Sequence, residues 1–121
     1  AQTPEGWRTH MGVTTREMAE AMLEAGAQIL GANCSVGPAE MVDIIAELRA
    51  AAPDTPLLVH PNAGQPELDD NGRIAYPLGP EAFAEFVPRL VEAGANIIGG
   101  CCGTGPEHIR QIRLAVDALR G

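Results

Sequence analysis

Hydrophobic residues recur along the chain in two alternating patterns: a helical one, with apolar positions three or four residues apart, and short continuous runs typical of buried strands. The helical pattern predicts helices over 14–26, from 38 to just before Pro53, over 81–93 and over 107–119. Apolar runs at 29–33, 57–59 and 97–98 predict three strands. This alternation indicates parallel pairing, because each crossover helix returns the chain to the same end of the sheet.

Local signals define the ends and inner faces of these helices. Thr14 and Glu17 have capping-box spacing, and Gly26 is suited to a C-cap. Pro38 opens the second helix, where proline is tolerated. Pro88 falls inside the third and either kinks it or marks a boundary. The positions expected to face inward are Met18, Ala21, Met22 and Ala25, then Met41, Ile44, Ile45 and Leu48, then Phe83, Phe86, Val87 and Leu90, and finally Ile109, Ile112, Val116 and Leu119.

Two segments show neither pattern, and we expect loops there. They are residues 1–12 and the longer stretch 64–79, which is rich in proline, glycine and aspartate. The order of elements predicts an α/β fold of parallel (β/α) units. A complete (β/α)₈ barrel typically needs about 250 residues, so residues 1–121 correspond to about half of a TIM-type barrel or to a small open sheet.

Composition and charge narrow the class of protein. With 45% hydrophobic and 20% charged residues, the chain has enough apolar residues for a core. It has 8 basic against 16 acidic residues and no basic cluster, so we expect neither nucleic acid nor a membrane surface as partner. The apolar runs are far shorter than a bilayer span and the N-terminus lacks signal-peptide features, from which we expect a cytoplasmic protein.

An internal repeat contains all three cysteines of the chain. Segment 23–34 (LEAGAQILGANC) returns as 91–102 (VEAGANIIGGCC), and each copy is followed by a Gly-Pro that opens a helix. Cys34, Cys101 and Cys102 therefore follow the ends of predicted strands. Ligands collect at this end of parallel strands, because the loops leaving it form the open rim of the sheet or barrel.

Three thiols in this arrangement predict a zinc site. Thiolates favour Zn²⁺ among the common intracellular metals, and three protein ligands leave one position open, as in catalytic sites. Adjacent Cys101 and Cys102 can reach one ion only where a strand ends and the backbone turns, which the flanking glycines permit. Cys34 can join them if only the strand 57–59 separates the two cysteine-bearing strands.

Other roles for these residues stay open. Each cysteine alone could be a small buried hydrophobic residue, and Cys101-Cys102 could form a reversible redox disulfide, although the Cys-X-X-Cys spacing is absent. His60 ends a strand and is either a pocket residue or a polar rim group. We expect His108, in the first turn of a helix, on the surface. Asn62 follows a strand end, where either a turn role or a site role fits.

Three motifs together resemble a known family. They are Gly31-Ala32-Asn33-Cys34, segment 60–66 (HPNAGQP) and segment 99–104 (GGCCGT). They are similar to successive signatures of the zinc-dependent homocysteine S-methyltransferases, and most similar to the homocysteine-binding modules of cobalamin-dependent methionine synthases. The resemblance runs over nearly all of the chain. It implies the C-terminal half of the family's (β/α)₈ barrel, from the end of the fifth strand through the eighth helix.

The resemblance also implies a chemistry. It assigns zinc to Cys34, Cys101 and Cys102, with Asn62 as an oxygen ligand when no substrate is bound, and Asn33 and Asn62 as substrate-binding residues. Homocysteine would take the open position, lose its thiol proton and accept a methyl group, giving methionine. Cobalamin on a separate domain or corrinoid protein is an implied methyl carrier. The residues leave betaine and S-methylmethionine open as other donors.

The family's early strands, which hold most contacts to the substrate's amino and carboxylate groups, have no counterpart in these residues. Open strand edges favour association, so we expect a homo-oligomer or pairing with a complementary half-barrel. Two functions follow. The first is a homocysteine methyltransferase, or the zinc-carrying half of such an enzyme. The second is a non-catalytic zinc-binding half-barrel that self-assembles.

Overall fold

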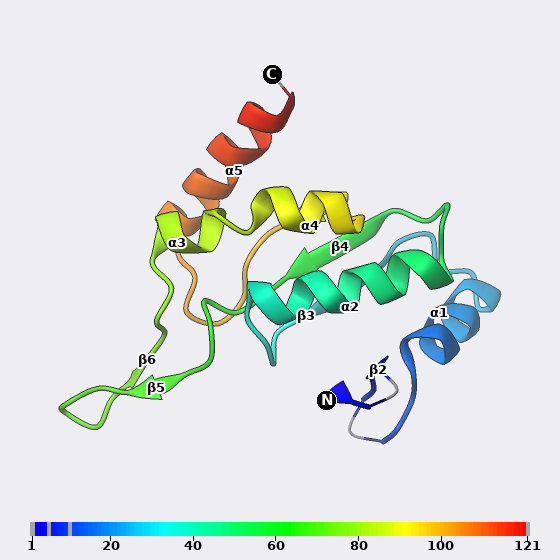
Figure 1. Cartoon of the computed structure of the whole chain (residues 1–121), viewed down its shortest axis with the longest axis horizontal. Coiled ribbons are helices and arrows are strands. Elements are labelled where there is room, and N and C mark those ends of the chain that lie inside the picture. Colours follow the sequence, from blue (N-terminus) through cyan, green and yellow to red (C-terminus); the bar gives the residue numbers. More distant parts are fainter. Residues whose placement is uncertain (1, 5, 10, 121) are drawn as a thin grey trace.

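The computed structural model describes residues 2–4, 6–9 and 11–120, and its centre is a sheet of three parallel strands (Figure 1). The strands are β3 (Leu30–Asn33), β4 (Leu57–His60) and β7 (Ile97–Ile98), in the order β3-β4-β7. The register aligns Asn33 with His60 and Val59 with Ile98. The predicted strand–helix alternation is therefore confirmed, and one strand separates the two that precede the cysteines.

All four predicted helices are present, and the one predicted over 81–93 is divided into two. They are α1 (Thr15–Glu24), α2 (Pro38–Ala51), α3 (Pro80–Ala84), α4 (Val87–Ala93) and α5 (Pro106–Arg120). The Thr14 hydroxyl accepts a hydrogen bond from the Glu17 amide at 3.1 Å, which is one half of a capping box, and it donates to the Glu17 carboxylate at 3.0 Å. Pro88 lies in the first turn of α4, so it marks a boundary between two helices.

The main core lies between the sheet and helices α2 and α4. Leu57 and Val59 of β4 are fully buried there against Ile45 and Leu48 of α2 and Leu90 of α4. Burying one such side chain contributes about 1.5–3 kcal/mol. A smaller buried cluster of Ala63, Phe83, Val87 and Ile112 joins α3, α4 and α5 to the loop that follows β4.

Several positions expected to face inward are exposed. In α1 the buried residue is Ala19, whereas Met22 is 51% exposed. Ile29, which begins the predicted strand 29–33 and precedes β3, is 52% exposed, and in α5 Ile109 and Leu119 are each 49% exposed. Apolar periodicity indicates a face suited to burial, but burial also needs a neighbouring element. Within the described residues, no strand pairs with the outer edge of β3, and α5 projects from the body (Figure 1).

Both predicted loops contain short antiparallel hairpins, which corrects the expectation for these segments. β1 (Gln2–Thr3) pairs with β2 (Gly6–Trp7), and β5 (Glu67–Leu68) pairs with β6 (Ile74–Ala75). Strands of two residues are too short to show an alternating pattern. Residues 1, 5 and 10 of the first segment lie outside the described residues. The β5–β6 hairpin projects as an arm from the body (Figure 1).

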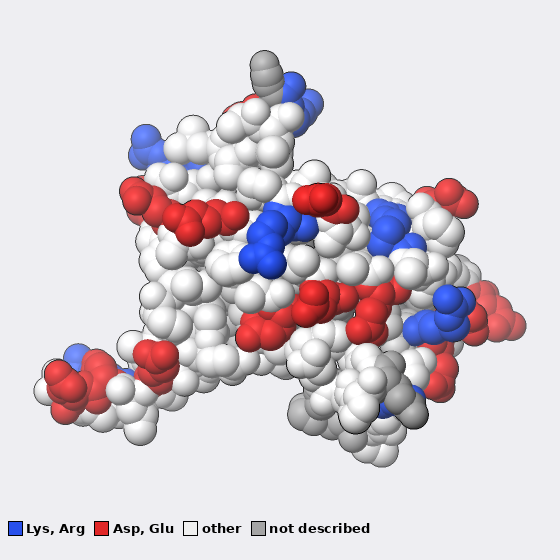
Figure 2. All heavy atoms as spheres, in the orientation of Figure 1, with Lys and Arg blue, Asp and Glu red and all other residues white. Residues whose placement is uncertain are grey.

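Acidic side chains predominate on the face shown in Figure 2. They form a row across the body and gather again on the β5–β6 arm, with basic side chains lying among them. Among residues 2–4, 6–9 and 11–120, none of the helices combines the length and apolar character needed to cross a bilayer.

Candidate metal centre

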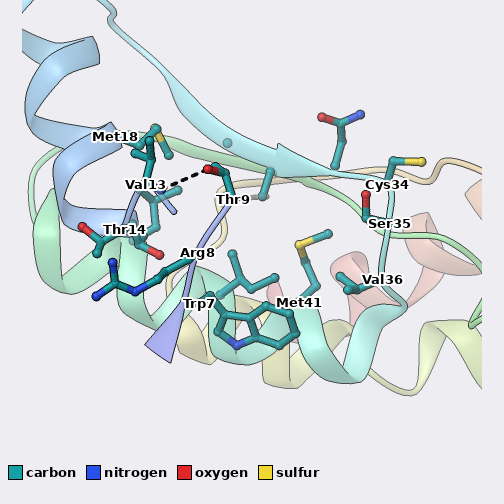
Figure 3. Close-up of a pocket in the computed structure, with 16 residues that line it drawn as sticks. Trp7, Arg8, Thr9, Val13, Thr14, Met18, Cys34, Ser35, Val36 and Met41 are labelled. Carbon is teal, nitrogen blue, oxygen red and sulfur yellow. Dashed lines mark hydrogen bonds between the residues drawn. The ribbon is translucent and has the colours of Figure 1, made fainter. Parts of the chain in front are cut away.

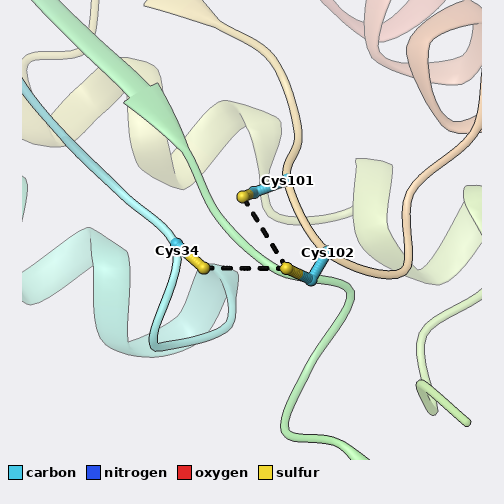
Figure 4. Close-up of side chains that lie close together, drawn as sticks. All are labelled: Cys34, Cys101 and Cys102. Carbon is cyan, nitrogen blue, oxygen red and sulfur yellow. Dashed lines mark hydrogen bonds between the residues drawn. The ribbon is translucent and has the colours of Figure 1, made fainter. Parts of the chain in front are cut away.

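The three cysteine sulfur atoms converge just beyond the carboxyl ends of β3 and β7 (Figure 4). The Sγ atom of Cys102 lies 3.7 Å from that of Cys34 and 3.9 Å from that of Cys101. All three sulfur atoms lie within 4.8 Å of one another. The thiols are free, and their residues are half-buried at Cys34 and Cys101 and exposed at Cys102. The cluster of cysteine side chains predicted from the internal repeat is therefore assembled by the fold.

The chain that continues from β4 holds both cysteine-bearing segments in place. The Cys34 amide donates to the carbonyl oxygen of His60 at 2.9 Å, and the Cys101 amide donates to that of Pro61 at 3.0 Å. Cys34 and Ser35 both adopt positive φ, 61° and 68°. This backbone conformation is uncommon outside glycine and concentrates at functional sites. It turns the chain after β3 so that the Cys34 side chain points toward the other two thiols.

A tight turn brings Cys101 and Cys102 to the same side. Gly103 follows with φ of 83°, and the Tyr76 side chain packs against it where a side chain would otherwise begin. The amide and hydroxyl of Thr104 both donate to the Cys101 carbonyl oxygen, at 3.1 and 2.7 Å. β7 ends at Ile98 and the backbone turns between Cys101 and Thr104, so the two neighbouring side chains need not point to opposite faces.

Asn62 and Asn33 occupy different places in this site. Asn62 is buried, and its Oδ1 atom accepts a hydrogen bond from the Cys102 amide at 3.1 Å. The next residue, Ala63, donates its amide to the Cys102 carbonyl oxygen at 2.9 Å. The loop after β4 therefore holds the Cys102 backbone on both sides. Asn33 is exposed at the end of β3, beside His60 in the register, and lines a neighbouring cavity.

That cavity, of about 320 Å³, opens beside Cys34 (Figure 3). It lies between the N-terminal segment, β3 and α2, and its lining is mostly apolar, including Trp7, Met18 and Met41. Polar groups of Thr9, Ser35 and Asn33 lie on its walls. An apolar cleft with a few polar groups and a thiol at its rim has the make-up of a small-molecule site.

The pKa values of Cys34 and Cys101 are shifted in opposite directions. A hydrogen bond from the Ser35 backbone, followed by those from Cys101 and Cys102, lowers the pKa of Cys34 below its ordinary value. A hydrogen bond to Cys34 and then burial raise the pKa of Cys101. Burial, followed by the nearby charge of Cys102, raises the pKa of the Tyr76 phenol.

The sulfur spacing fits a tetrahedral metal. Sulfur ligands about 2.3 Å from zinc lie about 3.8 Å apart at tetrahedral angles. The separations of the Cys102 sulfur from those of Cys34 and Cys101, 3.7 and 3.9 Å, bracket this value, and the third pair lies within 4.8 Å. The cluster is also the one group of three potential metal-binding His, Cys, Asp or Glu side chains found within the described residues. Its donor set, three thiols without a fourth protein sulfur, suits Zn²⁺ and leaves one position open.

His108 lies near this centre, buried, and not on the surface as expected. Its Nε2 atom lies 2.9 Å from the Leu78 carbonyl oxygen, and its Nδ1 atom accepts from the Gly105 amide at 3.2 Å. Sequence reasoning missed it because a polar residue in a first helical turn usually faces solvent. The signal that could have found it is its place three residues after Gly105, where a side chain can reach back to the amide before the helix.

The fold and the cluster together define the class of protein: a domain of TIM-type β/α units with three thiols at the carboxyl ends of its strands. The profile of the homocysteine S-methyltransferase family matches residues 2–116, and the chain belongs to this family. The family resemblance stated from the three motifs is therefore confirmed.

Individual relatives agree with this assignment. The chain is 44% identical over 92 residues to methionine synthase of Mycobacterium leprae (strain TN), and 44% identical over 96 residues to methionine synthase of Mycobacterium tuberculosis (strain ATCC 25618 / H37Rv). These matches cover 75% and 78% of this chain but 8% of each relative. The chain therefore spans a small part of these proteins.

A solved structure supports the fold. The homocysteine methyltransferase MmuM from Escherichia coli, in its oxidised form, matches with a TM-score of 0.65 and 26% sequence identity. The match covers 85% of this chain and 30% of that one. The predicted fold class, parallel (β/α) units that form part of a TIM-type barrel, is confirmed.

Proposed function

We propose that this chain is the zinc-carrying part of a homocysteine S-methyltransferase, which activates the thiol of homocysteine for methyl transfer to give methionine. Residues 1–121 then form one partial homocysteine-binding barrel domain. The observation that supports this most is the three-sulfur cluster, spaced for a tetrahedral metal at the strand ends of a chain that belongs to this family. Cys34, Cys101 and Cys102 are the proposed ligands.

The chemistry needs an activated sulfur. A free thiol has a pKa near 8.5, so the thiol of homocysteine is mostly protonated at neutral pH and a weak nucleophile. A zinc ion held by three thiolates would supply a Lewis acid that favours loss of this proton at its fourth position while leaving the sulfur nucleophilic. In the overall reaction a carbon–sulfur bond to homocysteine forms and the bond between the methyl group and its donor breaks.

The chain's own residues position the reacting groups. The loop after β4 holds the Cys102 backbone through Asn62 and Ala63. Asn62 and Asn33 are proposed substrate-binding residues, and Asn62 is also a proposed oxygen ligand in the absence of substrate. The cavity beside Cys34 is of a size suited to an amino acid and adjoins the thiol cluster. We further propose a methyl donor or corrinoid protein as partner, with cobalamin as carrier.

A second candidate function is a non-catalytic zinc-binding half-barrel that assembles with a second copy or with a complementary half. Partly exposed apolar residues at both flanks of the sheet favour it. Ile29 beside β3 is 52% exposed and Ile97 in β7 is 42% exposed. Methylation of homocysteine in the presence of zinc, assayed with and without a complementary barrel half, separates the two. Turnover in either assay supports the methyltransferase, and its absence from both leaves the zinc-binding half-barrel.

Substitution of the thiols tests the metal assignment. Cys34→Ser, Cys101→Ser and Cys102→Ser should each abolish stoichiometric zinc binding, measured by metal analysis after dialysis. Ser35→Ala is the matched control, because it alters the neighbour of Cys34 and keeps all three thiols. Full zinc occupancy in any of the three serine variants would refute the assignment of that cysteine as a ligand.

A further inference from the structure

A closed ring of hydrogen bonds links α5 to the loop that contains Cys102. The Ala63 amide donates to the Cys102 carbonyl oxygen at 2.9 Å, and the Leu78 amide donates to the Ala63 carbonyl oxygen at 3.0 Å. The Leu78 carbonyl oxygen lies 2.9 Å from His108 Nε2. His108 Nδ1 accepts from the Gly105 amide at 3.2 Å, and the chain from Gly105 back to Cys102 closes the ring.

His108 supplies the one side chain in this ring, and both of its nitrogen atoms are used. Because Nδ1 accepts from a backbone amide, the proton lies on Nε2, which donates to the Leu78 carbonyl oxygen. The imidazole thus provides an acceptor, Nδ1, and a donor, Nε2, at different positions along the side chain. The shorter asparagine side chain can place an acceptor near the position of Nδ1, and the longer glutamine side chain can place a donor near the position of Nε2. Neither residue replaces both atoms.

The environment of the imidazole makes these bonds hard for water to replace. His108 is 9% exposed, and its ring meets that of Phe83 edge to face, with centroids 5.7 Å apart. Removing the imidazole would leave the Gly105 amide and the Leu78 carbonyl oxygen without this partner at a largely buried position, which is unfavourable.

The loop needs such a support because its own backbone is permissive. Gly103 and Gly105 flank Thr104, and glycine imposes little stiffness of its own. Thr104 ties the near end of the loop to the Cys101 carbonyl oxygen. His108 ties the far end, where the loop enters α5.

We propose that His108 is a positioning residue for Cys102: through this ring it holds the loop 101–105 in the arrangement that brings the three sulfur atoms within 4.8 Å of one another. The inference rests on the proposed zinc site. The imidazole nitrogens of His108 bind the backbone of Gly105 and Leu78 rather than a sulfur atom. Its effect on Cys102 therefore passes through backbone hydrogen bonds.

Three substitutions in the 121-residue chain test the proposal. Outer hydrogen-bonding partners of metal ligands typically contribute 10- to 100-fold to affinity, so His108→Ala should weaken zinc binding by about tenfold. His108→Asn and His108→Gln should each show a smaller loss, because each keeps one of the two hydrogen bonds. Competition with a chromophoric chelator measures the affinity, and the sulfur-to-metal absorption of the Co²⁺-loaded chain reports the arrangement of the thiols.

Ile112→Ala is the control for a merely structural role. Ile112 is buried in the cluster that includes Phe83, against which His108 packs, and it belongs to the same helix as His108, but it is not part of the ring. This variant should lose stability while keeping the zinc affinity and the Co²⁺ spectrum of the parent chain. If His108→Ala does not fold, the asparagine and glutamine variants are compared with the control instead.

A metal-free measurement separates this inference from the proposed function. Amide hydrogen exchange at Ala63 and Leu78, whose amides donate within the ring, should be about tenfold faster in His108→Ala than in Ile112→Ala once global stability is matched. Failure of the parent chain to bind zinc would contradict the proposed function, and the exchange result would still decide the role of His108 in the loop. Equal exchange in the two variants, or equal zinc affinity where the parent binds zinc, would overturn the proposal.

Discussion

Cys34 and Cys101 differ in acidity because each has a different set of neighbours. Cys34 follows a strand and turns through positive φ, which exposes its sulfur to a hydrogen bond from the Ser35 backbone. This bond and those from the other two thiols lower the pKa of Cys34, whereas the hydrogen bond to Cys34 and then burial raise the pKa of Cys101. As pH rises in the metal-free protein, Cys34 therefore becomes a thiolate before Cys101.

This difference predicts an order of reactivity. A thiol is unreactive below its pKa and a nucleophile above it, so the alkylation rate of Cys34 should reach its midpoint at lower pH than that of Cys101. Iodoacetamide modification of the metal-free chain over about pH 6 to 10, followed by peptide mass mapping, measures both midpoints. Zinc should protect both residues. Modification of Cys101 at the lower pH would contradict the hydrogen-bond pattern described for the cluster.

Arg49 joins three secondary-structure elements at the end of the sheet opposite the thiols. The Arg49 guanidinium donates to the carbonyl oxygens of Ala52 and Thr55 at 3.0 and 2.7 Å, and to that of Gly94 at 2.7 Å. It also donates to Asn96 Oδ1 at 2.8 Å, which in turn accepts from the Leu57 amide at 2.9 Å. Arg49 thus connects the end of α2, the start of β4 and the turn before β7.

Loss of this hub should destabilise the fold without touching the candidate metal centre. Arg49→Ala should lower the free energy of unfolding by about 2–3 kcal/mol, because it leaves several partly buried carbonyl groups without their donor. Arg113→Ala is the matched control, since its ion pair with Asp117 is exposed and should contribute less than about 1 kcal/mol. Urea unfolding of both variants measures the difference. Equal losses would show that Arg49 does not organise these elements.

Element ends and element order could be predicted from sequence because they depend on local chemistry. Thr14, Pro38 and Pro88 mark helix boundaries through capping and through the missing amide of proline, and those signals act wherever the chain folds. The two-residue hairpins and the burial of His108 could not be predicted in this way. They depend on which distant segment provides a partner, such as the Leu78 carbonyl oxygen for His108, and a one-dimensional pattern contains no such information.

The candidate site was predictable in its members more than in its geometry. Repetition of the cysteine-bearing segment selected Cys34, Cys101 and Cys102, and parallel topology placed them at one end of the sheet. The positive φ of Cys34 and the Asn62 contact to the Cys102 amide were not predictable, because both arise from the packing of two loops. The roles of Cys34, Cys101 and Cys102 as metal ligands stay predictions.

For the molecule as a whole, partly exposed apolar side chains mark the flank formed by β7 and α5. Ile97 is 42% exposed at the edge of the sheet, and Ile109 and Leu119 are each 49% exposed on α5. A second hollow, of about 410 Å³, lies between α4, β7 and α5 and is lined largely by apolar residues. Apolar surface next to an unpaired strand edge favours association with another β/α unit.

The isolated chain should therefore self-associate in a concentration-dependent manner. Ile97→Lys should reduce association, because a charge on an edge strand disfavours pairing with another strand. Leu68→Lys is the control, since Leu68 lies on the projecting arm and is 73% exposed there, away from the sheet. Sedimentation velocity over a range of concentrations measures both. A monomer at all concentrations, or an equal effect of the two substitutions, would contradict association through this flank.

In the proposed centre the three thiols hold one zinc ion, with a position left for the thiol of homocysteine. X-ray absorption spectroscopy of the zinc-loaded chain at the zinc edge counts the sulfur ligands of this ion. We expect three sulfur ligands at about 2.3 Å, rising to four when homocysteine is added. A zinc ion with fewer than three sulfur ligands, or a sulfur count that does not change with homocysteine, would contradict it.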